Sequence, residues 1–346
     1  YRAGQERDLA TKLGIIGLPL SGRSTTFEAL TRQGSETASR GEDRLAVVRV
    51  PDERVDRLSR MFEPQKTIYA QVDYFLAGQG SQKKEANPWL PVKDCDALIQ
   101  VVRNHGPDRT PAADFRAVEQ ELILSDLVQV EKRLERIELD HRRGKKMNTE
   151  EQQLLTECHR LLEAETLLRR RPELSDAKPL RGFALLTAKP MLVLFNNEDG
   201  DAALPDIGEI ADHEKCLVLR GKLEQELARM SEEDAAEFLK EYQIDTSAMG
   251  RMIRLSYEVM GLIAFFTVGS DEVRAWTIRR GTPAVEAAGA IHSDIQKGFI
   301  RAEVISYEDL MAAGSTAEAR RGGTFRLEGK TYEVKDGDII NFRFNV

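Results

Sequence analysis

Short apolar runs recur along the chain and alternate with amphipathic segments. Each run has the length and the content of valine, isoleucine and leucine that are typical of a buried strand. The runs cover residues 13–16, 45–50, 67–76, 95–103, 190–195 and 216–219. Between two of them, Val55, Leu58 and Phe62 share one face of a predicted helix over residues 52–62. Strands that alternate with helices predict an α/β fold with a mainly parallel, doubly wound sheet, whose ligand loops follow the carboxyl ends of the strands.

The middle of the chain has a different pattern. Hydrophobic residues recur every three or four positions through residues 119–137 and again through residues 150–168, with charged residues between them. This spacing predicts two long helices that pack together as a hairpin. Gly144 marks the bend, and the capping-box pattern of residues 149–152 predicts the start of the second helix.

The predicted bend carries the densest basic cluster of the chain, which is Arg142, Arg143, Lys145 and Lys146. Two interpretations of this cluster stay open. In the first, the cations lie in solvent and stabilise the carboxyl end of the first helix, whose dipole favours positive charge there. In the second, they contact RNA phosphates.

The C-terminal part of the chain predicts a small mixed α+β unit. Strands are predicted over residues 264–268, 273–279, 298–305, 331–334 and 339–344, and a helix over residues 284–295. Trp276 either stacks on a nucleic-acid base or belongs to the core. Positive charge in this part comes from Arg274, Arg279, Arg280, Lys297 and Arg301. His292 and Asp294 have no nucleophile spaced with them, so we expect a capping or surface role rather than catalysis.

The stretch from Leu13 to Thr31 combines a strand, a glycine-bounded loop and the start of a helix. Against the phosphate-loop pattern G-x-x-x-x-G-K-[ST], Gly17, Gly22 and Ser24 fall in register, but Arg23 stands where lysine is expected. The two glycines let successive amides point inward, and the following helix presents its N–H groups to the same place. The sequence therefore predicts a site for a phosphate chain.

Individual residues of this loop have separate expected roles. Ser24 would place its hydroxyl on Mg²⁺, and Thr25 would contact an α-phosphate. Arg23 offers a planar fork in place of the compact charge of lysine, so binding could persist while hydrolysis geometry suffers. The candidate nucleotide-binding residues of the loop are Gly17, Leu20, Ser21, Gly22, Arg23, Ser24 and Thr25.

Composition narrows the possible partners. A chain of 346 residues is long for one core and favours two or three domains. Its formal net charge of -8 argues against binding nucleic acid through the overall field, so such a contact needs a local basic patch. Cys95, Cys158 and Cys216 are too widely spaced for a zinc or redox motif. Without a long apolar run or an apolar signal-peptide core, we expect no membrane span and a cytoplasmic location.

Three stretches of the chain together match one known pattern. They are GLPLSGRSTTFEALT (17–31), KPMLVLFNNEDG (189–200) and a C-terminal block that begins with LIAFFTVGSDEVRAWTIRRGT (262–282) and ends with DGDIINFRFNV (336–346). With the predicted helical hairpin, they resemble the YchF or Obg-like ATPase branch of the translation-factor-related P-loop GTPases. The C-terminal block resembles the TGS domain of that family.

The resemblance implies a P-loop NTPase domain with an inserted coiled-coil hairpin and a C-terminal β-grasp TGS domain. The implied ranges are 12–118 and 180–260 for the two parts of the nucleotide-binding domain, 119–179 for the hairpin and 261–346 for the TGS domain. It also implies Mg²⁺ with ATP or GTP as the ligand, and the ribosome or RNA as the partner of the hairpin tip and the TGS domain.

The chain departs from the family at both switch elements. The second switch should carry D-x-A-G, but residues 75–78 read Phe-Leu-Ala-Gly, so Phe75 takes the place of the aspartate that orders Mg²⁺. The threonine of the first switch would fall in residues 33–44, where Ser35, Thr37 and Ser39 are candidates by position only. Phosphoryl transfer depends on positioning and electrostatics, so we expect hydrolysis to be weak or absent.

The base-recognition motif can be aligned in two ways. Guanine-specific members of the wider class use N-K-x-D, whereas the YchF branch uses N-x-x-E. In the sequence Asn196-Asn197-Glu198-Asp199, either Asp199 takes the fourth place or a one-residue deletion puts Glu198 at the family glutamate. Gly221 and Lys222 stand where the class has a second loop against the base. The choice between ATP and GTP stays open.

We therefore expect a YchF-like protein in which Mg²⁺-nucleotide binding sets the arrangement of the hairpin and the TGS domain for a ribosome or RNA partner. The alternative from another class is a pseudo-GTPase scaffold that binds RNA or protein without nucleotide. A third possibility is that the chain senses a small nucleotide signal without hydrolysing it.

Overall fold

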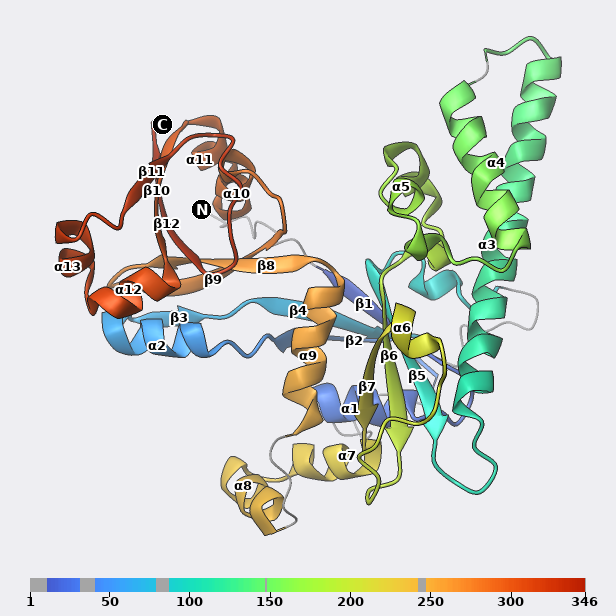
Figure 1. The fold of residues 1–346 in the computed structure, drawn as a ribbon, viewed down its shortest axis with the longest axis horizontal. Helices are drawn as coiled ribbons and strands as arrows, with labels where there is room; N and C mark the ends of the chain where they lie inside the picture. The colour runs from blue at the N-terminus through green and yellow to red at the C-terminus, as the bar shows by residue number, and fades with distance from the viewer. Residues whose placement is uncertain (1–10, 32–40, 79–86, 147, 242–246, 346) are drawn as a thin grey trace. The chain divides into compact units, whose positions relative to one another are not determined.

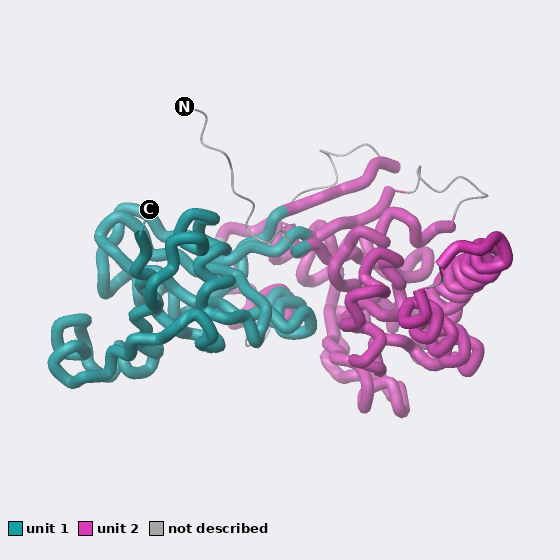
Figure 2. The backbone as a smooth tube through the Cα atoms, turned by 90° about the horizontal axis from the view of Figure 1, so that it is seen from above, with its two compact units in different colours: residues 1–11, 47–73, 253–346 teal, residues 12–46, 74–252 magenta. Residues whose placement is uncertain are grey.

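The computed structural model describes residues 11–31, 41–78, 87–146, 148–241 and 247–345. The chain forms two compact units (Figure 2). One unit holds Val47–Asp73 and the chain from Ile253 onwards, and the other holds Lys12–Ala46 and Tyr74–Met252. This division into two units does not test the four domain ranges expected from the sequence, which stay predictions.

The larger unit is built around a sheet that, in the described part of the chain, has the strand order β2-β4-β1-β5-β6-β7 (Figure 1). The strands are β1 (Lys12–Ile16), β2 (Arg44–Arg49), β4 (Gln71–Leu76), β5 (Ala97–Asn104), β6 (Met191–Asn197) and β7 (Lys215–Leu219). The strands β1, β5, β6 and β7 pair with one another in parallel, and this confirms the predicted parallel sheet. Their carboxyl ends are followed by the loops and helix starts that carry the candidate site residues, apart from Asn196, which lies in β6 itself.

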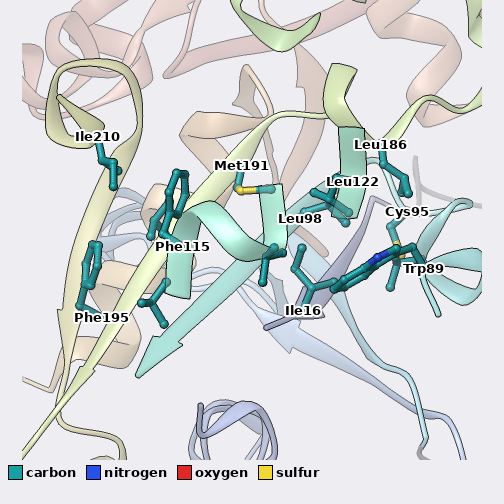
Figure 3. Packing of buried hydrophobic residues seen from close by; sticks show 14 of the residues in the cluster. Ile16, Trp89, Cys95, Leu98, Phe115, Leu122, Leu186, Met191, Phe195 and Ile210 are labelled. Carbon is teal, nitrogen blue, oxygen red and sulfur yellow. The ribbon is translucent and has the colours of Figure 1, made fainter. Parts of the chain in front are cut away.

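Alternate side chains of β5 and β6 pack against α3 (Pro111–Arg142) in a continuous apolar core. Figure 3 shows Phe115 and Leu122 of α3 facing Leu98 of β5 and Phe195 of β6. These four side chains are at most 3% exposed. Burial of this size is the main stabilising contribution in such a domain.

Two helices close to the phosphate loop pack against each other. They are α1 (Arg23–Thr31) and α7 (Gly221–Arg229). Glu28 of α1 is buried, and it accepts hydrogen bonds from Gln225 of α7 and from Arg44. The helix that follows the phosphate loop, α1, is therefore fixed to α7, whose first two residues are Gly221 and Lys222.

The predicted hairpin is present and consists of α3 and α4 (Thr149–Glu163) (Figure 1). Leucines and other apolar residues of both helices form one buried cluster. The helices differ from the prediction at their ends, because α3 extends further in both directions and α4 ends at Glu163. The capping box predicted from Thr149 is also wrong by one residue, since Asn148 is the N-cap and its Oδ1 accepts from the Glu151 N–H at 3.3 Å.

Asp126 anchors the base of the hairpin. Its fully buried carboxylate accepts from the backbone N–H groups of Leu186 and Thr187, at 2.9 and 2.7 Å, and from the Thr187 hydroxyl at 2.7 Å. Burial raises the pKa of Asp126 above its ordinary value. These bonds fix α3 to the short helix η6 (Leu186–Ala188), which leads directly into β6.

Further short helices complete the larger unit and the passage to the smaller one. They are η3 (Leu90–Val92), η4 (Leu168–Arg170), α5 (Pro172–Ser175), η5 (Lys178–Phe183), α6 (Ile210–His213), α8 (Glu232–Glu241) and α9 (Ala248–Val259). Among the described residues, no helix is both long enough and apolar enough to cross a membrane.

The smaller unit contains a second sheet, with the order β11-β10-β12-β8-β9-β3 over the residues that the structure describes. Its strands are β3 (Lys66–Ile68), β8 (Leu262–Val268), β9 (Glu272–Arg279), β10 (Phe299–Ser306), β11 (Arg326–Glu328) and β12 (Asp338–Phe344). Its helices are α2 (Glu53–Phe62), α10 (Ala284–Ile291), α11 (Ser293–Lys297), α12 (Tyr307–Ala313) and α13 (Thr316–Arg321).

Several predictions for this unit need correction. The predicted strand over residues 67–76 is two strands, because β3 pairs with β9 in this sheet while β4 belongs to the first sheet. Residues 331–334 form only an isolated bridge between Glu333 and Pro283. The predicted helix 284–295 is interrupted at His292, whose Nδ1 accepts from the Asp294 N–H at 3.0 Å, so the capping role of His292 is confirmed.

Trp276 belongs to the core of the smaller unit. Its side chain is 7% exposed, stacks on Phe265 with ring centroids 6.5 Å apart, and donates from Nε1 to the Thr267 hydroxyl at 2.9 Å. The Arg274 guanidinium lies 3.8 Å from the centroid of the Trp276 ring. Of the two interpretations of Trp276, the core role is therefore confirmed.

Candidate nucleotide-binding site

The phosphate loop has a backbone that glycine alone can adopt at two positions. Gly17 and Gly22 have φ of 148° and 100°, and Leu20 between them has φ of 65°. A Cβ on Gly17 would lie 2.4 Å from the Val101 carbonyl oxygen, and a Cβ on Gly22 would lie 2.2 Å from the Asn196 Nδ2. The predicted roles of both glycines in the loop follow from this close approach and from the positive φ.

The helix α1 begins at Arg23, immediately after the loop. The Ser21 N–H donates to the Leu18 carbonyl at 3.2 Å and the Thr26 N–H to the Gly22 carbonyl at 2.8 Å. A helix start leaves its first N–H groups without partners inside the helix, and these groups favour an anion. Ser24 is exposed in this first turn, where its hydroxyl is accessible to Mg²⁺.

Two buried hydroxyl groups of this loop and helix have no hydrogen-bond partner among the described residues. Ser21 is 1% exposed and Thr26 is fully buried, and within the described residues neither Ser21 Oγ nor Thr26 Oγ1 has a hydrogen-bond partner. Buried hydroxyls in folded proteins nearly always have a partner. The residues present at the loop therefore fit a bound polar group such as a phosphate.

Asn196 connects the phosphate loop to the start of α7. Its Nδ2 donates to the Ser21 carbonyl at 3.0 Å, and its Oδ1 accepts from the Gly221 N–H at 3.0 Å. Asn196 is 5% exposed, so both hydrogen bonds are shielded from water. Gly221 is required at this contact, because a Cβ there would lie 2.6 Å from Asn196 Oδ1. The structure thus brings Gly22, Asn196 and Gly221 together.

The two carboxylates of the predicted base motif lie in different contacts. Glu198 Oε1 accepts from the Gly106 N–H at 2.9 Å, and Asp199 Oδ1 accepts from the Leu223 N–H at 3.2 Å. Both residues are exposed, as is Lys222. Asp199 therefore lies beside the second base loop, and Glu198 lies beside the turn after β5.

Arg23, the residue in the place of the family lysine, is half-buried at the first position of α1. Burial lowers the pKa of its guanidinium. Arginine starts so far above neutral pH that the group stays charged. The loop therefore keeps a cation next to the phosphate site, although its shape differs from that of lysine.

The position of the second switch is packed against protein. Phe75 is 7% exposed and belongs to the apolar core with Ile16 and Trp89, while Lys12 Nζ lies 4.0 Å from the centroid of its ring. The Gly78 N–H donates to Asp43 Oδ1 at 2.8 Å. The three first-switch candidates, Ser35, Thr37 and Ser39, lie outside the described residues.

A buried ionic network was not predicted from the sequence. Arg169 Nη2 lies 2.8 Å from a carboxylate oxygen of Glu119 and 2.9 Å from one of Glu214, and all three side chains are at most 7% exposed. Glu214 directly precedes β7, whose end leads to Gly221. The network thus ties the base of α3 to the strand before the second base loop. These residues have no spacing or motif that could have identified them.

The hairpin tip is exposed, and part of its charge is compensated. Arg142 pairs with Glu138, and Lys145 Nζ lies 2.8 Å from Asp140 Oδ1. Lys145 lowers the pKa of the half-buried Asp140. No ion pair to Arg143 or Lys146 is present among the residues with a described structure. Arg143 and Lys146 thus make no direct ion pair within the described part of the tip, but the charge of Arg143 also contributes, after that of Lys145, to the lowered pKa of Asp140.

The chain is similar to known proteins over nearly its full length. A family model for the C-terminal domain of YchF GTPases, described as a protein of unknown function (DUF933), matches residues 262–345. The chain is 36% identical to the ribosome-binding ATPase YchF of Bacillus subtilis (strain 168), over 98% of this chain and 100% of that protein. It is also 36% identical to the protein of that name from Escherichia coli O157:H7, over 97% of this chain and 99% of that protein.

A solved structure gives the same result. The Schizosaccharomyces pombe YchF GTPase matches with a TM-score of 0.81 at 29% identity, covering 96% of this chain and 97% of that one. The mixed α/β fold implied by the resemblance is therefore confirmed. The sequence identity over the full length and the structural match together show that the chain belongs to the YchF family.

Proposed function

We propose that this chain binds a purine nucleotide with Mg²⁺ at the phosphate loop, hydrolyses it weakly or not at all, and associates with the ribosome. The observation that carries the nucleotide proposal is the Asn196 bridge, which holds the Ser21 carbonyl and the Gly221 N–H at 3.0 Å each. A buried amide that joins the phosphate loop to the start of α7 would preorganise both ends of the proposed nucleotide pocket.

Different elements of the structure would contact different parts of the nucleotide. The loop from Gly17 to Gly22 and the first turn of α1 would hold the phosphates, and Arg23 would add a charge there. The Ser24 hydroxyl would hold Mg²⁺, which neutralises phosphate charge when bound. Asp199 or Glu198, together with Lys222, would contact the base.

Weak or absent hydrolysis is proposed from the second switch. In the family pattern an aspartate stands at position 75, but here the side chain is aromatic and lies in the apolar core. The Gly78 N–H already donates to Asp43. Neither position offers a free polar group for ordering Mg²⁺ or the terminal phosphate, and phosphoryl transfer relies on such groups.

A second candidate function is a scaffold that binds RNA or protein without any nucleotide. The burial of Phe75 favours the scaffold function, because a protein that does not hydrolyse nucleotide has no need of an aspartate at the second switch. The unpartnered Ser21 hydroxyl favours nucleotide binding instead, since a decayed pocket has no reason to keep a buried polar group without a partner.

Ribosome association is proposed from the relatives, which are named ribosome-binding ATPases. The contacts would be made by the basic hairpin tip and by the C-terminal unit, which we propose to be a TGS domain of β-grasp type. This role implies that the protein works in the cytoplasm. Arg143 and Lys146 make no direct ion pair among the described residues of the tip, so their charges are suited to RNA phosphates.

The nucleotide proposal is tested by calorimetric titration with ATP and with GTP, in Mg²⁺ and in excess chelator. We expect one of the two nucleotides to bind, which also chooses the base. Arg23→Ala should weaken binding, and Ser24→Ala should remove most of its dependence on Mg²⁺. If the folded wild-type protein binds neither nucleotide, the nucleotide proposal is wrong.

The ribosome proposal is tested by co-sedimentation with purified ribosomes. Reversing Arg143 and Lys146 to glutamate should reduce the bound fraction. A matched control reverses the exposed Lys178 and Arg181, which lie on η5 of the same unit. Equal binding by the tip variant and the wild-type protein would remove the role assigned to the tip.

A further inference from the structure

The base of the hairpin carries a cavity that none of the predicted site residues lines. The cavity lies within the larger unit and has a volume of about 210 Å³. Its lining residues come from α3, from residues 165–170 and from residues 209–213. Sites for drug-sized ligands measure about 300–1,000 Å³. The cavity therefore has the size for a molecule smaller than a nucleotide.

Four of the lining residues are apolar and form the floor of the cavity. They are Phe115, Ile123, Leu167 and Ile210, and each is at most 9% exposed. Phe115 and Ile210, both labelled in Figure 3, belong to the core of the first sheet, whereas Ile123 and Leu167 belong to the cluster of the hairpin. An apolar group bound on this floor would be removed from water, which is favourable.

Glu119 adds a buried carboxylate to the lining. Its side chain is 6% exposed, and its Oε2 accepts from Arg169 Nη2 at 2.8 Å. Its other oxygen, Oε1, is buried and has no hydrogen-bond partner among the described residues, and the same holds for Arg169 Nη1. Buried polar atoms nearly always have a partner. A donor group on a bound molecule would satisfy the Glu119 oxygen.

The charges around Glu119 favour a cation as that donor. Glu119 and Glu214 share the Arg169 guanidinium, at 2.8 and 2.9 Å, so two buried carboxylates face one buried cation. Arg170 is further away and partly exposed, with its Nη2 3.6 Å from Glu214. Burial raises the pKa of Glu119, and the charge of Arg169 opposes this shift. An ammonium group beside Glu119 would be stabilised, because an incompletely paired buried charge is costly.

The exposed rim of the cavity carries both signs of charge. Arg116 and Arg170 contribute cations, and Glu165 and Glu209 contribute carboxylates. In the part of the chain that the structure describes, Arg116 makes no ion pair. A guanidinium binds a carboxylate through two parallel hydrogen bonds. The lining therefore suits a ligand that carries a positive and a negative group together.

We propose that this cavity binds a small α-amino acid with an aliphatic side chain, such as leucine. The ammonium group contacts Glu119, the carboxylate contacts Arg116, and the side chain packs on the floor. Arg116 and Glu119 are three residues apart on α3, so they share one face of the helix with their Cβ atoms about 5–6 Å apart. Both groups of an amino acid are attached to one carbon, so this spacing allows the two contacts at once.

Calorimetric titration of the full-length protein with leucine, without nucleotide, measures the binding. Three analogues each lack one part of leucine: 4-methylpentanoate lacks the ammonium group, 3-methylbutylamine lacks the carboxylate, and glycine lacks the side chain. We expect leucine to bind with a Kd of about 1 mM or tighter. Each analogue should bind at least about tenfold more weakly, because each loses a charge-assisted hydrogen bond or the apolar contact.

Two variants and two matched controls locate the binding. Glu119→Gln should weaken leucine binding about tenfold or more, and Arg116→Gln, at an exposed position, about three- to tenfold. Glu224→Gln is the control for a buried carboxylate, and Arg136→Gln is the control for an exposed arginine of α3. Neither control residue lines the cavity, so both variants should keep the wild-type affinity within about a factor of two. Thermal melting checks the fold of every variant.

Four results would overturn the inference. The first is no binding of leucine by the folded wild-type protein. The second is equal affinity for leucine and 3-methylbutylamine, which would show a site for amines instead. The third is unchanged affinity in folded Arg116→Gln and Glu119→Gln, which would place the binding elsewhere. The fourth is an equal loss in Glu119→Gln and Glu224→Gln, which would show a general effect of stability.

Discussion

The phosphate loop follows β1, and residues 75–78 lie at the end of β4, the neighbouring strand of the same sheet. The two segments differ in the hydrogen-bonding state of their polar groups. In the loop, the Ser21 hydroxyl is buried and has no partner among the described residues. At the end of β4, Phe75 fills the core, and the Gly78 N–H donates to Asp43. The phosphate loop therefore has a polar group available to a ligand, whereas residues 75 and 78 are in contact with other parts of the protein. From this contrast we infer that the chain has lost the residues expected for nucleotide hydrolysis separately from those expected for nucleotide binding.

The largest expected effect breaks the phosphate loop itself. In Gly22→Ala, the new Cβ would meet Asn196 Nδ2 at 2.2 Å, and φ of 100° is strained for alanine. We expect nucleotide affinity to fall by about a hundredfold or more, which corresponds to about 2.7 kcal/mol. Calorimetry measures the affinity.

The control for this variant is Gly144→Ala at the hairpin bend. Gly144 also has positive φ, at 80°, but nothing lies within 4 Å of a Cβ placed there. The strain of about 1–2 kcal/mol should lower stability without changing nucleotide affinity. Full nucleotide binding by Gly22→Ala would show that the loop is not the site.

The second largest effect is expected when the two hydrogen bonds of Asn196, to Ser21 and to Gly221, are removed. Asn196→Ala leaves the Ser21 carbonyl and the Gly221 N–H without their buried partner, which should cost about 2–4 kcal/mol of unfolding free energy. Nucleotide affinity should fall roughly tenfold or more, because about 1.4 kcal/mol of lost preorganisation is a factor of ten. Denaturant unfolding and calorimetry measure the two effects.

The matched control for Asn196 is a neighbouring buried amide. Asn104 Nδ2 donates to Asn197 Oδ1 at 2.8 Å, a hydrogen bond in which no residue of the phosphate loop takes part. Asn104→Ala should destabilise the fold by a comparable amount and leave nucleotide affinity within about a factor of two, well under 1.4 kcal/mol. If both variants lose affinity equally, the bridge has no specific role and the effect is one of general stability.

The smallest expected effect on affinity is at the second switch. Phe75→Leu keeps an apolar side chain in the core and should cost about 1 kcal/mol of unfolding free energy. Nucleotide affinity should stay unchanged, because the ring has no polar group to offer. A large loss of affinity in Phe75→Leu would remove the contrast between the two segments, whereas hydrolysis restored by a folded Phe75→Asp variant would support it.

Local patterns were sufficient to predict much of the fold. The apolar runs predicted β1, β5, β6 and β7, because buried parallel strands have a distinctive composition over a few residues. The spacing of hydrophobic residues predicted the hairpin, and the glycine spacing predicted the phosphate loop. Each of these signals lies within one continuous segment of the sequence.

Features that depend on distant residues were missed. The apolar run 67–76 predicts one strand, yet β3 pairs with β9 of the other sheet, and nothing local indicates where the run divides. Sequence analysis placed Asn196 in base recognition but could not show that it bonds Ser21 and Gly221, which come from distant positions of the chain. The Arg169 network is invisible for the same reason, because ion pairs between distant residues have no sequence period.

The central claim is that the chain keeps a nucleotide pocket without efficient hydrolysis. The most direct measurement is single-turnover phosphate release from the bound nucleotide, made on protein whose nucleotide occupancy is measured on the same sample by calorimetry. We expect the site to fill and the release of phosphate to stay near the rate of a no-protein control. Rapid release from the filled site would contradict the account, because Phe75 and Gly78 would then stand in a working catalytic site.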